Sequence, residues 1–256
     1  MMASLKNKNK LRKRSIFVTL LGFFVLAFVA ASIQPYPPNI DAETTLIEAL
    51  GHYPSEHRRL KDGTYLVAVR TPMPDVTADM VRWWFSDFLQ TTEHYKLWHP
   101  RDHVWMDWEN KKSGEIYGAS HLVHEYIGAD LNKLRIQFVP PEEFFGRAPN
   151  DADNFVLCAR VGELETPIYF ARMCHIVRNT QDGAEMRSRF WLGHVSARKG
   201  DNIAASPINL IGNGWLTRHL IITDRLASDL HRHASEEMAI LATLLPSLFE
   251  KNQMVN

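Results

Sequence analysis

Near its C-terminus the chain carries an apolar stripe at helical spacing that two ionisable residues interrupt. Steps of four and three residues connect its members: Leu226, Leu230, His233, Glu237, Ile240 and Leu244. This spacing places all of them on one face of a helix, and the four apolar members predict that the face is buried. A buried imidazole and a buried carboxylate are costly unless something compensates them. The fold is therefore expected to bring a compensating group to this helix.

His233 and Glu237 stand one helical turn apart, so both side chains can reach the same point in space. Helical His and Glu residues at this spacing are known to chelate metal ions. Two other interpretations remain open from the spacing alone. The pair can form a buried His–Glu hydrogen bond, or the helix can be rotated so that both side chains meet water.

The N-terminus combines a basic cluster with a long apolar run. Residues 1–14 contain six basic side chains from Lys6 to Arg14, and the run at 15–33 has no charged residue. Such a run is about long enough to cross a bilayer, and the basic flank predicts a cytoplasmic N-terminus with the remainder exported. We expect a single-pass membrane anchor at 15–33. The alternative is a signal peptide cleaved near Val29-Ala30-Ala31, which leaves a secreted or periplasmic protein.

The rest of the chain has the composition of one globular domain. Residues 34–42 are rich in proline and are expected to form an extended linker, and residues 43–256 can bury a substantial core. The formal net charge is +0, and no basic stripe lies outside the N-terminus, so nucleic acid binding is not expected. Cys158 and Cys174 are too few for a disulfide scaffold or a cysteine zinc site, and their pairing is undetermined.

The middle of the chain alternates apolar and polar residues as strands do. Six segments fit this pattern: HVWMDW, SHLVHEYI, LRIQFV, NFVLCARV, IYFARMCHIV and EMRSRFWLGH. A strand at 64–70 and helices at 43–51 and 80–89 precede them, and Thr77 is placed to cap the second helix. One long helix is expected over 215–249. Many antiparallel strands before one long helix predict an α+β fold in which a curved sheet grips the helix, with a cavity between them.

Other polar residues could join the helical pair. Glu125 is expected to share a strand face with His121 and Val123, and His103 opens a strand whose face includes Trp105 and Asp107. A sheet wrapped around the last helix could aim His103 and Glu125 at the helical pair. Two imidazoles and two carboxylates suit zinc, with iron or manganese possible. Each strand residue taken alone is also consistent with a structural histidine or a solvent-facing carboxylate.

Five stretches between Met80 and Phe249 resemble, in the same order, the diacetylphloroglucinol hydrolase family, which includes phloretin hydrolase. They are WWF, YKLWHP with RDH, HEYIG followed by KLRIQFVPPEEFF, EMRSRFWLG, and HASEEM. The resemblance implies a helix-grip fold like that of START domains and the birch-pollen allergen. It also implies hydrolysis of the carbon–carbon bond between an acyl group and an aromatic ring, with one zinc ion held by two His and two Glu.

The same resemblance implies which residues form the site. His233 and Glu237 match the helical ligand pair, and Glu125 matches the strand glutamate. His103 is the expected fourth ligand because it follows the Tyr-Lys-Leu-Trp segment at the family's distance. The interval from His103 to Glu125 is shorter than in the family, so two other histidines remain alternatives: His99 and His94.

Outside the metal ligands, His175 resembles the family's active-site histidine and Tyr95 a phenol-binding tyrosine, and both are expected to act in catalysis. His175 is suited to moving a proton because histidine titrates near neutral pH. Phe190 stands where some members carry a second tyrosine, which removes a hydroxyl from the pocket and leaves the substrate open. The aromatic residues expected to line the cavity are Trp98, Trp105, Phe138 and Phe190.

The expected function is a zinc-dependent hydrolase of carbon–carbon bonds in ketonic substances that acts on an acylphloroglucinol-like small molecule. Two alternatives stay open. One is a START-like module that carries a hydrophobic ligand or lipid without catalysis. The other is an esterase or lactonase that uses the same metal site. A membrane partner is expected only through residues 15–33, and the oligomeric state is undetermined.

Overall fold

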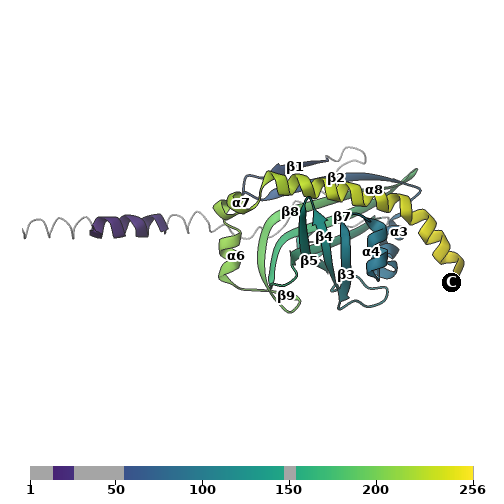
Figure 1. The fold of residues 1–256 in the computed structure, drawn as a ribbon, viewed down its shortest axis with the longest axis horizontal. Helices are drawn as coiled ribbons and strands as arrows, with labels where there is room; N and C mark the ends of the chain where they lie inside the picture. Colours follow the sequence, from purple (N-terminus) through teal and green to yellow (C-terminus); the bar gives the residue numbers. More distant parts are fainter. Residues whose placement is uncertain (1–13, 26–54, 147–153, 256) are drawn as a thin grey trace, which may run out of the picture.

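The structure is a computed structural model that describes residues 14–25, 55–146 and 154–255 (Figure 1). The helix expected at 43–51 and the linker expected at 34–42 lie outside the described residues, as does the small-residue motif at 29–31.

The prediction of a membrane-spanning segment at residues 15–33 is wrong. The described helix in this region covers residues 14–25. Among all residues that the structure describes, no helix has both the length and the hydrophobicity of a membrane span. The predicted single-pass membrane location is corrected accordingly.

One antiparallel sheet of nine strands forms the body of the domain. Its strand order is β1-β2-β8-β7-β6-β5-β4-β3, and β9 pairs with β8. The six strand segments predicted between His103 and His194 all lie within β3 to β8. The strands are β1 (Glu56–Arg59), β2 (Tyr65–Pro74), β3 (His103–Glu109), β4 (Ser120–Ile127), β5 (Asp130–Val139), β6 (Asn154–Glu163), β7 (Ile168–Thr180), β8 (Gly183–Lys199) and β9 (Asn202–Ala204).

The long helix α8 (Asp224–Val255) lies across the sheet and packs against β1, β2 and β4 (Figure 1). Shorter helices close the two ends of the space between them. They are α3 (Ala78–Trp83) continuing into the π-helical turn η1 (Trp84–Phe88), α4 (Thr92–Trp98), α6 (Pro207–Gly212) and α7 (Trp215–Ile221). The short helix α5 (Glu142–Phe145) lies on the other face of the sheet. The Thr77 side chain accepts a hydrogen bond from the Met80 amide, as predicted for the cap of α3. The predicted α+β, helix-grip architecture is confirmed.

The single helix predicted over residues 215–249 is interrupted. Residues 215–221 form α7, and the backbone turns extended at Ile222 before α8 begins. Ile222 buries its side chain in the core, and the Thr223 hydroxyl accepts a hydrogen bond from the Leu226 amide at 3.2 Å. The helix is therefore broken at this junction, where Ile222 packs into the core and Thr223 caps the start of α8.

The buried face of α8 differs by about one residue from the predicted stripe. Its fully buried apolar members are Ala227, Ala234, Met238, Leu241 and Leu245, whereas Leu226 is exposed. His233 and Glu237 lie beside this row and are still buried, with 3% and 8% of each residue exposed. The helix is rotated from the predicted orientation, but not far enough to bring the pair into water.

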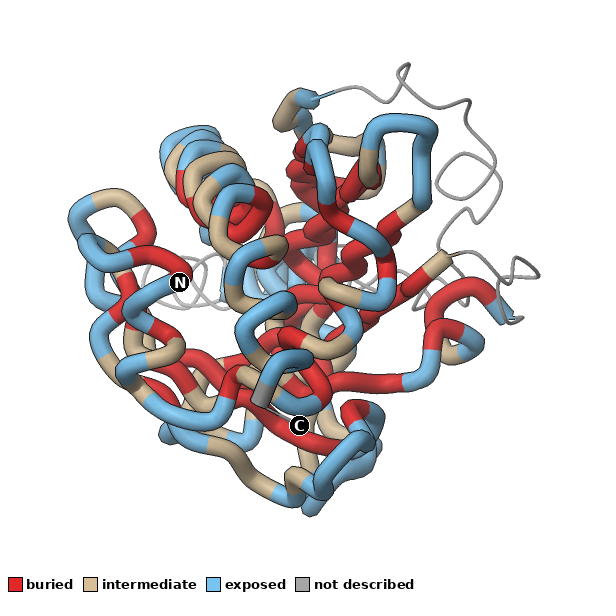
Figure 2. Tube along the Cα trace, turned by 90° about the vertical axis from the view of Figure 1, so that its right-hand side faces the viewer, coloured by how far each residue is buried: buried red, intermediate tan, exposed pale blue. Residues whose placement is uncertain are grey.

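The sheet is packed on both faces. The larger core joins the inner face to α3, η1, α4 and α8, and buried segments gather in the interior of the domain (Figure 2). A smaller core lies on the other face, where Phe144 and Phe145 of α5 pack near Cys158 and Cys174. These cysteines stand opposite each other on β6 and β7 and form a disulfide. The pairing that the sequence left undetermined is thus given by strand register.

Candidate metal centre

Helix α8 brings two potential ligands to the inner face of the sheet. His233 and Glu237 project from adjacent turns, and the distance from His233 Nε2 to the nearest Glu237 oxygen is 3.9 Å. No hydrogen bond is present between them at this distance, which argues against the simple buried His–Glu pair. Trp98 Nε1 donates to the Glu237 carbonyl oxygen at 3.0 Å and ties this turn of α8 to α4.

Strands β3 and β4 supply two more side chains from the opposite side. His103 and Glu125 are direct partners in the ladder between these strands. His103 Nε2 lies 4.0 Å from a Glu125 oxygen and 3.5 Å from a Glu237 oxygen. Three of the four predicted ligands lie close enough to hold one ion: His103, His233 and Glu237. Glu125 adjoins this group through its contact with His103.

The predicted face of β3 needs correction. A bulge lies between His103 and Trp105, so the alternation of the strand shifts by one residue. Met106 is buried on the side of His103, whereas Asp107 is exposed. Trp105 was expected to line the cavity, but its ring contacts His124 instead, with ring centroids 4.7 Å apart.

The hydrogen bonds of the two histidines leave one nitrogen of each ring directed at this centre. His103 Nδ1 lies 2.9 Å from the Tyr95 carbonyl oxygen, and His233 Nδ1 lies 3.4 Å from an Asp102 carboxylate oxygen. Both acceptors hold the proton on Nδ1, which makes Nε2 a lone-pair donor. The Nε2 atoms of both rings are buried without a hydrogen-bond partner. Two unpartnered imidazole nitrogens facing carboxylate oxygens fit a divalent metal ion.

Burial also shapes the ionisation of the centre. Desolvation raises the pKa of Glu237 to about 8, although the nearby His233 opposes this shift. Desolvation lowers the pKa of His103, so its ring favours the neutral form that binds metals. The Tyr95 hydroxyl donates to the Glu125 carboxylate, and burial raises the pKa of Tyr95 well above its usual range. Without a cation, the site favours a protonated Glu237.

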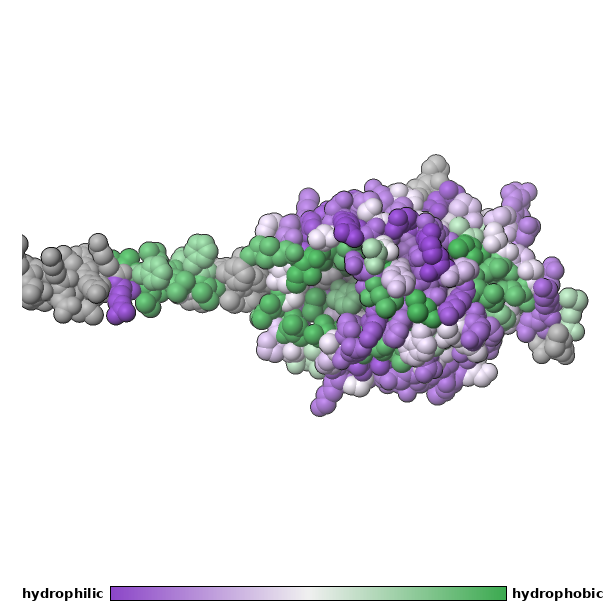
Figure 3. Space-filling model, viewed as in Figure 1, coloured by the Kyte–Doolittle hydropathy of each residue, from purple (hydrophilic) through white to green (hydrophobic). Residues whose placement is uncertain are grey.

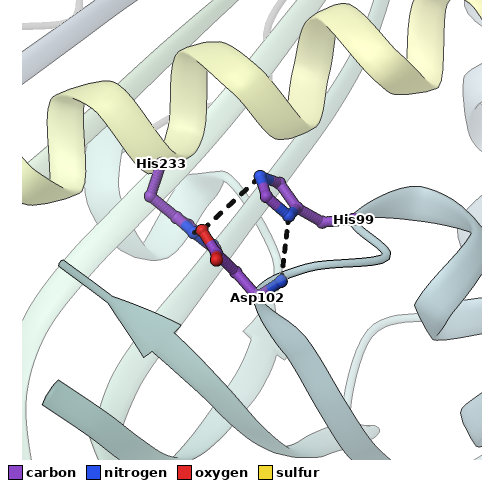
Figure 4. A group of neighbouring side chains, drawn as sticks. All are labelled: His99, Asp102 and His233. Carbon is purple, nitrogen blue, oxygen red and sulfur yellow. Dashed lines mark hydrogen bonds and ion pairs between the residues drawn. The ribbon is translucent and has the colours of Figure 1, made fainter. Parts of the chain in front are cut away.

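A second group of possible ligands adjoins the first and shares His233. It consists of His99, Asp102 and His233, which point toward one another from the loop before β3 and from α8 (Figure 4). His99 Nε2 lies 3.6 Å from Asp102 and 3.4 Å from Glu236, and Arg101 also pairs with Asp102. Here His233 turns its Nδ1 to Asp102. This group therefore supports the ring of His233 from behind the main centre.

His94, the remaining alternative ligand, lies apart from both groups. Its Nδ1 is 2.7 Å from the Phe88 carbonyl oxygen, and its ring stacks on the Phe88 ring.

The two predicted catalytic residues lie in a small pocket beside the centre. This pocket has a volume of about 50 Å³ and is lined by Tyr95, His175, Glu125, His233 and Glu237, together with the aromatic rings of Phe85, Trp98, Phe138 and Phe190. His175 Nδ1 lies 2.8 Å from the Ser188 hydroxyl. Burial lowers the pKa of His175 to about 4, so the ring is neutral at pH 7 and does not titrate near neutrality as expected.

Two residues of this region were not predicted as part of the site. Asp102 holds His233, and its signal in the sequence was only its place beside His103. His121 was assigned to the face of Glu125 without a role. It is buried, lines the small pocket, and stacks on Trp108 with centroids 4.7 Å apart. Desolvation lowers the pKa of His121 to about 3, which makes it a neutral wall of the pocket.

Solved structures similar to this chain include the protein named Ara h 8.0201 and norcoclaurine synthase of Thalictrum flavum. The first has 9% sequence identity and a TM-score of 0.44, and the match covers 72% of this chain and 99% of the other. The second has 12% identity and a TM-score of 0.37, with 72% and 92% of the two chains covered.

Sequence relatives are more informative. Phloretin hydrolase of Eubacterium ramulus is 27% identical over 205 residues, which cover 75% of this chain and 70% of the relative. A 2,4-diacetylphloroglucinol hydrolase of Pseudomonas protegens is also 27% identical, over 72% of this chain and 64% of the relative. The family described as DAPG hydrolase PhiG domain matches residues 39–250, a range that includes every residue of the metal centre and its pocket. The chain therefore belongs to the DAPG hydrolase family.

Proposed function

We propose that this protein is a metal-dependent hydrolase that cleaves the bond between an acyl group and a polyhydroxylated aromatic ring, releasing a carboxylic acid. One observation carries the proposal: His103 and His233 aim unpartnered, buried Nε2 atoms at the carboxylates of Glu125 and Glu237. Membership in the family and the names of the two relatives support the choice of substrate class.

In this proposal the four residues hold one divalent ion, with zinc the best match to two imidazoles and two carboxylates. When bound, the ion supplies Lewis-acid activation of the ketone and of the attacking water. The raised pKa of Glu237 means that this carboxyl gives up its proton as the ion binds. Asp102 and the Tyr95 carbonyl oxygen keep the two imidazoles in the orientation and tautomer that binding requires.

The remaining pocket residues orient the substrate. Water forms a bond to the acyl carbon, the bond from that carbon to the ring breaks, and its electron pair stays on the ring carbon, which takes a proton. His175 is neutral at pH 7 and can hydrogen-bond a ring hydroxyl or relay this proton. The Tyr95 hydroxyl keeps its proton and holds Glu125 in place. Rings such as Phe85 and Trp98 offer faces against which an aromatic substrate can pack.

Metal analysis of single variants tests the ligand set. We expect about one zinc ion per full-length chain by plasma mass spectrometry, and its loss in His103→Ala and in Glu237→Gln. The matched control is Glu250→Gln, at an exposed position near the end of the same helix. His99→Ala separates the two groups of ligands, because it should retain the ion if His103 is the ligand. Loss of zinc in His99→Ala but not in His103→Ala would move the site to the outer group.

Turnover tests the reaction. The zinc-loaded protein should release acetate from 2,4-diacetylphloroglucinol, or an arylpropionate from phloretin, together with the deacylated phenol. In ¹⁸O-labelled water, one labelled oxygen should appear in the acid and none in the phenol. Hydrolysis of phenyl esters without any cleavage of the ketones would assign the site to esterase chemistry instead.

A further inference from the structure

A second, larger chamber adjoins the small pocket and has no role in the proposed chemistry. Its volume is about 520 Å³, which lies in the range of sites for whole small molecules. The two spaces share lining residues at their junction: Glu125, Ile136, Met173, Phe190 and Leu230. The larger chamber extends from this junction to α6 and α7, where hydrophobic side chains surround a hollow in the surface (Figure 3). A molecule with its reactive bond at the metal centre can therefore extend into this chamber.

The wall of the outer chamber is almost wholly apolar. Side chains from β5, β6, β7 and β8 and from the helices form it, among them Leu134, Val161, Ile168, Leu192 and Ile222. Its few polar members are largely occupied. Arg218 donates to the Gly193 carbonyl oxygen at 2.9 Å and to Asn213 at 3.1 Å. A hydroxyl group placed there would lose its water and find few partners, at a net penalty, whereas methylene groups would gain from burial.

The inner pocket has a mixed lining. Several polar side chains converge there on a small volume, including Tyr95, His121, His175 and Glu237, between aromatic rings. The two spaces therefore differ in the share of polar groups in their walls. Hydroxyl groups that face the inner pocket can find partners there, and an apolar substituent is satisfied in the outer chamber.

The edge of the outer chamber is also apolar. Three residues that line it are exposed: Ile211 of α6 (57%), Ile221 of α7 (70%) and Leu226 of α8 (39%). Exposed apolar side chains that gather around a cavity mark a ligand-binding groove more often than they occur by chance. A polar, fully hydroxylated molecule could enter the chamber without exposed apolar side chains around its opening.

From this geometry we infer that the outer chamber binds a long aliphatic acyl chain, so that the substrate class is a polyhydroxyphenyl alkyl ketone. The inference rests on the proposed function, because the metal centre fixes where the ketone lies. The ketone carbon sits at the metal centre. The hydroxylated ring lies at the junction of the two spaces, since an inner pocket of about 50 Å³ cannot enclose a ring, and its hydroxyls face that pocket. The alkyl chain passes Phe190 and Met173 toward α6 and α7. The chain of the substrate, rather than its ring, then determines specificity.

The test is a series of acylphloroglucinols whose acyl chains run from two to about twelve carbons, assayed with the zinc-loaded full-length protein. We expect kcat/KM to rise about threefold to fourfold with each added methylene, the fold-change that corresponds to about 0.8 kcal/mol per buried CH₂, until the chamber is full. A flat or falling series, with the acetyl compound still cleaved, would overturn the inference and leave the proposed function standing.

Variants locate the effect. Thr217 of α7 lines the chamber and is half-buried, so Thr217→Trp should flatten the chain-length series. Leu220→Trp is the matched control, because Leu220 lies on the same short helix, is 73% exposed and does not line the chamber. Ile211→Asp places a charge at the edge and provides a second test at a surface position. Equal chain-length series in all four proteins would contradict the assignment of the chamber.

A binding measurement separates this inference from the proposed reaction. Alkylresorcinols carry ring hydroxyls and an alkyl chain but no ketone, so they can bind without being cleaved. Calorimetric Kd values should fall with each methylene in the wild-type protein and in Leu220→Trp, and not in Thr217→Trp. If no ketone is cleaved but this trend holds, the proposed reaction is wrong and the chamber is still an alkyl-chain site. If ketones are cleaved and the trend is absent, the reaction holds and the chamber does not bind the chain.

Discussion

Replacing Glu237 with glutamine should stabilise the metal-free protein although it abolishes metal binding. Burial raises the pKa of Glu237 to about 8 in the folded chain, against 4.5 for a free glutamate side chain. Above pH 4.5 the unfolded chain releases this proton and the folded chain does not, so ionisation favours unfolding. This loss in the free energy of unfolding is absent below pH 4.5 and grows by about 1.4 kcal/mol for each pH unit above it. It becomes constant above about pH 8.

At pH 7 this loss comes to about 3 kcal/mol. Glutamine keeps the shape of the side chain and cannot ionise, but its buried amide costs about 1 kcal/mol where it lacks partners. We therefore expect metal-free Glu237→Gln to be about 2 kcal/mol more stable than the metal-free wild type at pH 7, and no more stable at pH 4. Saturating zinc should reverse the order, because a ligand at about 1,000 times its Kd stabilises the wild type by about 4 kcal/mol.

Urea unfolding followed by circular dichroism measures this difference, with protein stripped by a chelator and then reloaded with zinc. Glu250→Gln, at the exposed end of α8, serves as the control and should follow the wild type in every condition. The reasoning is refuted if metal-free Glu237→Gln is less stable than the wild type at pH 7 while the control is unchanged. That result would mean that the fold itself stabilises the charged carboxylate, and that Glu237 is a structural residue.

Three further predictions concern residues around the centre. Asp102→Asn should weaken zinc binding about tenfold to a hundredfold, because the partner of His233 Nδ1 loses its charge. Competition with a chromophoric chelator measures the affinity, and an unchanged affinity would remove Asp102 from the site. Because burial lowers the pKa of His175 from 6.5 to about 4, the free energy of unfolding should fall as pH decreases across that interval. His175→Gln should flatten this decrease. Parallel plots of unfolding free energy against pH for the variant and the wild type would show that the His175 ring is not the cause. Replacing Cys158 and Cys174 with serine should reduce stability by about 3 kcal/mol, given the 16-residue separation, and a non-reducing peptide map that finds both thiols free would contradict the disulfide.

Several elements of the fold could be predicted because their signals are local. Period-two alternation marked β3 to β8, and the spacing of Thr77 and the apolar residues after it marked α3. The break between α7 and α8 was not predicted, because Ile222 leaves the helix for a core contact that another part of the chain supplies. The apolar segment near the N-terminus was predicted as a membrane span from composition, whereas none of the helices that the structure describes is long and apolar enough to cross a membrane.

That His233 and Glu237 share a helical face follows from their spacing alone, because four residues make about one turn whatever surrounds the helix. The sequence also identified the other polar residues of the proposed site through their family resemblance. How these residues meet depends on contacts between distant segments of the fold. A bulge turns His103 toward the centre, strand register sets it opposite Glu125, and Asp102 reaches His233 across 131 positions of the chain.

The same distinction applies to the cavity and the disulfide. Alternation predicted that a sheet would enclose a space beside the helix. The size of that space, and its division into a small pocket of mixed lining and a larger apolar chamber, depend on packing among distant elements. Cys158 and Cys174 became partners only when β6 and β7 paired in one register. Local spacing fixes which residues share a face, and long-range packing fixes which faces meet, because contacts between distant segments are set by the whole core and by no single stretch of sequence.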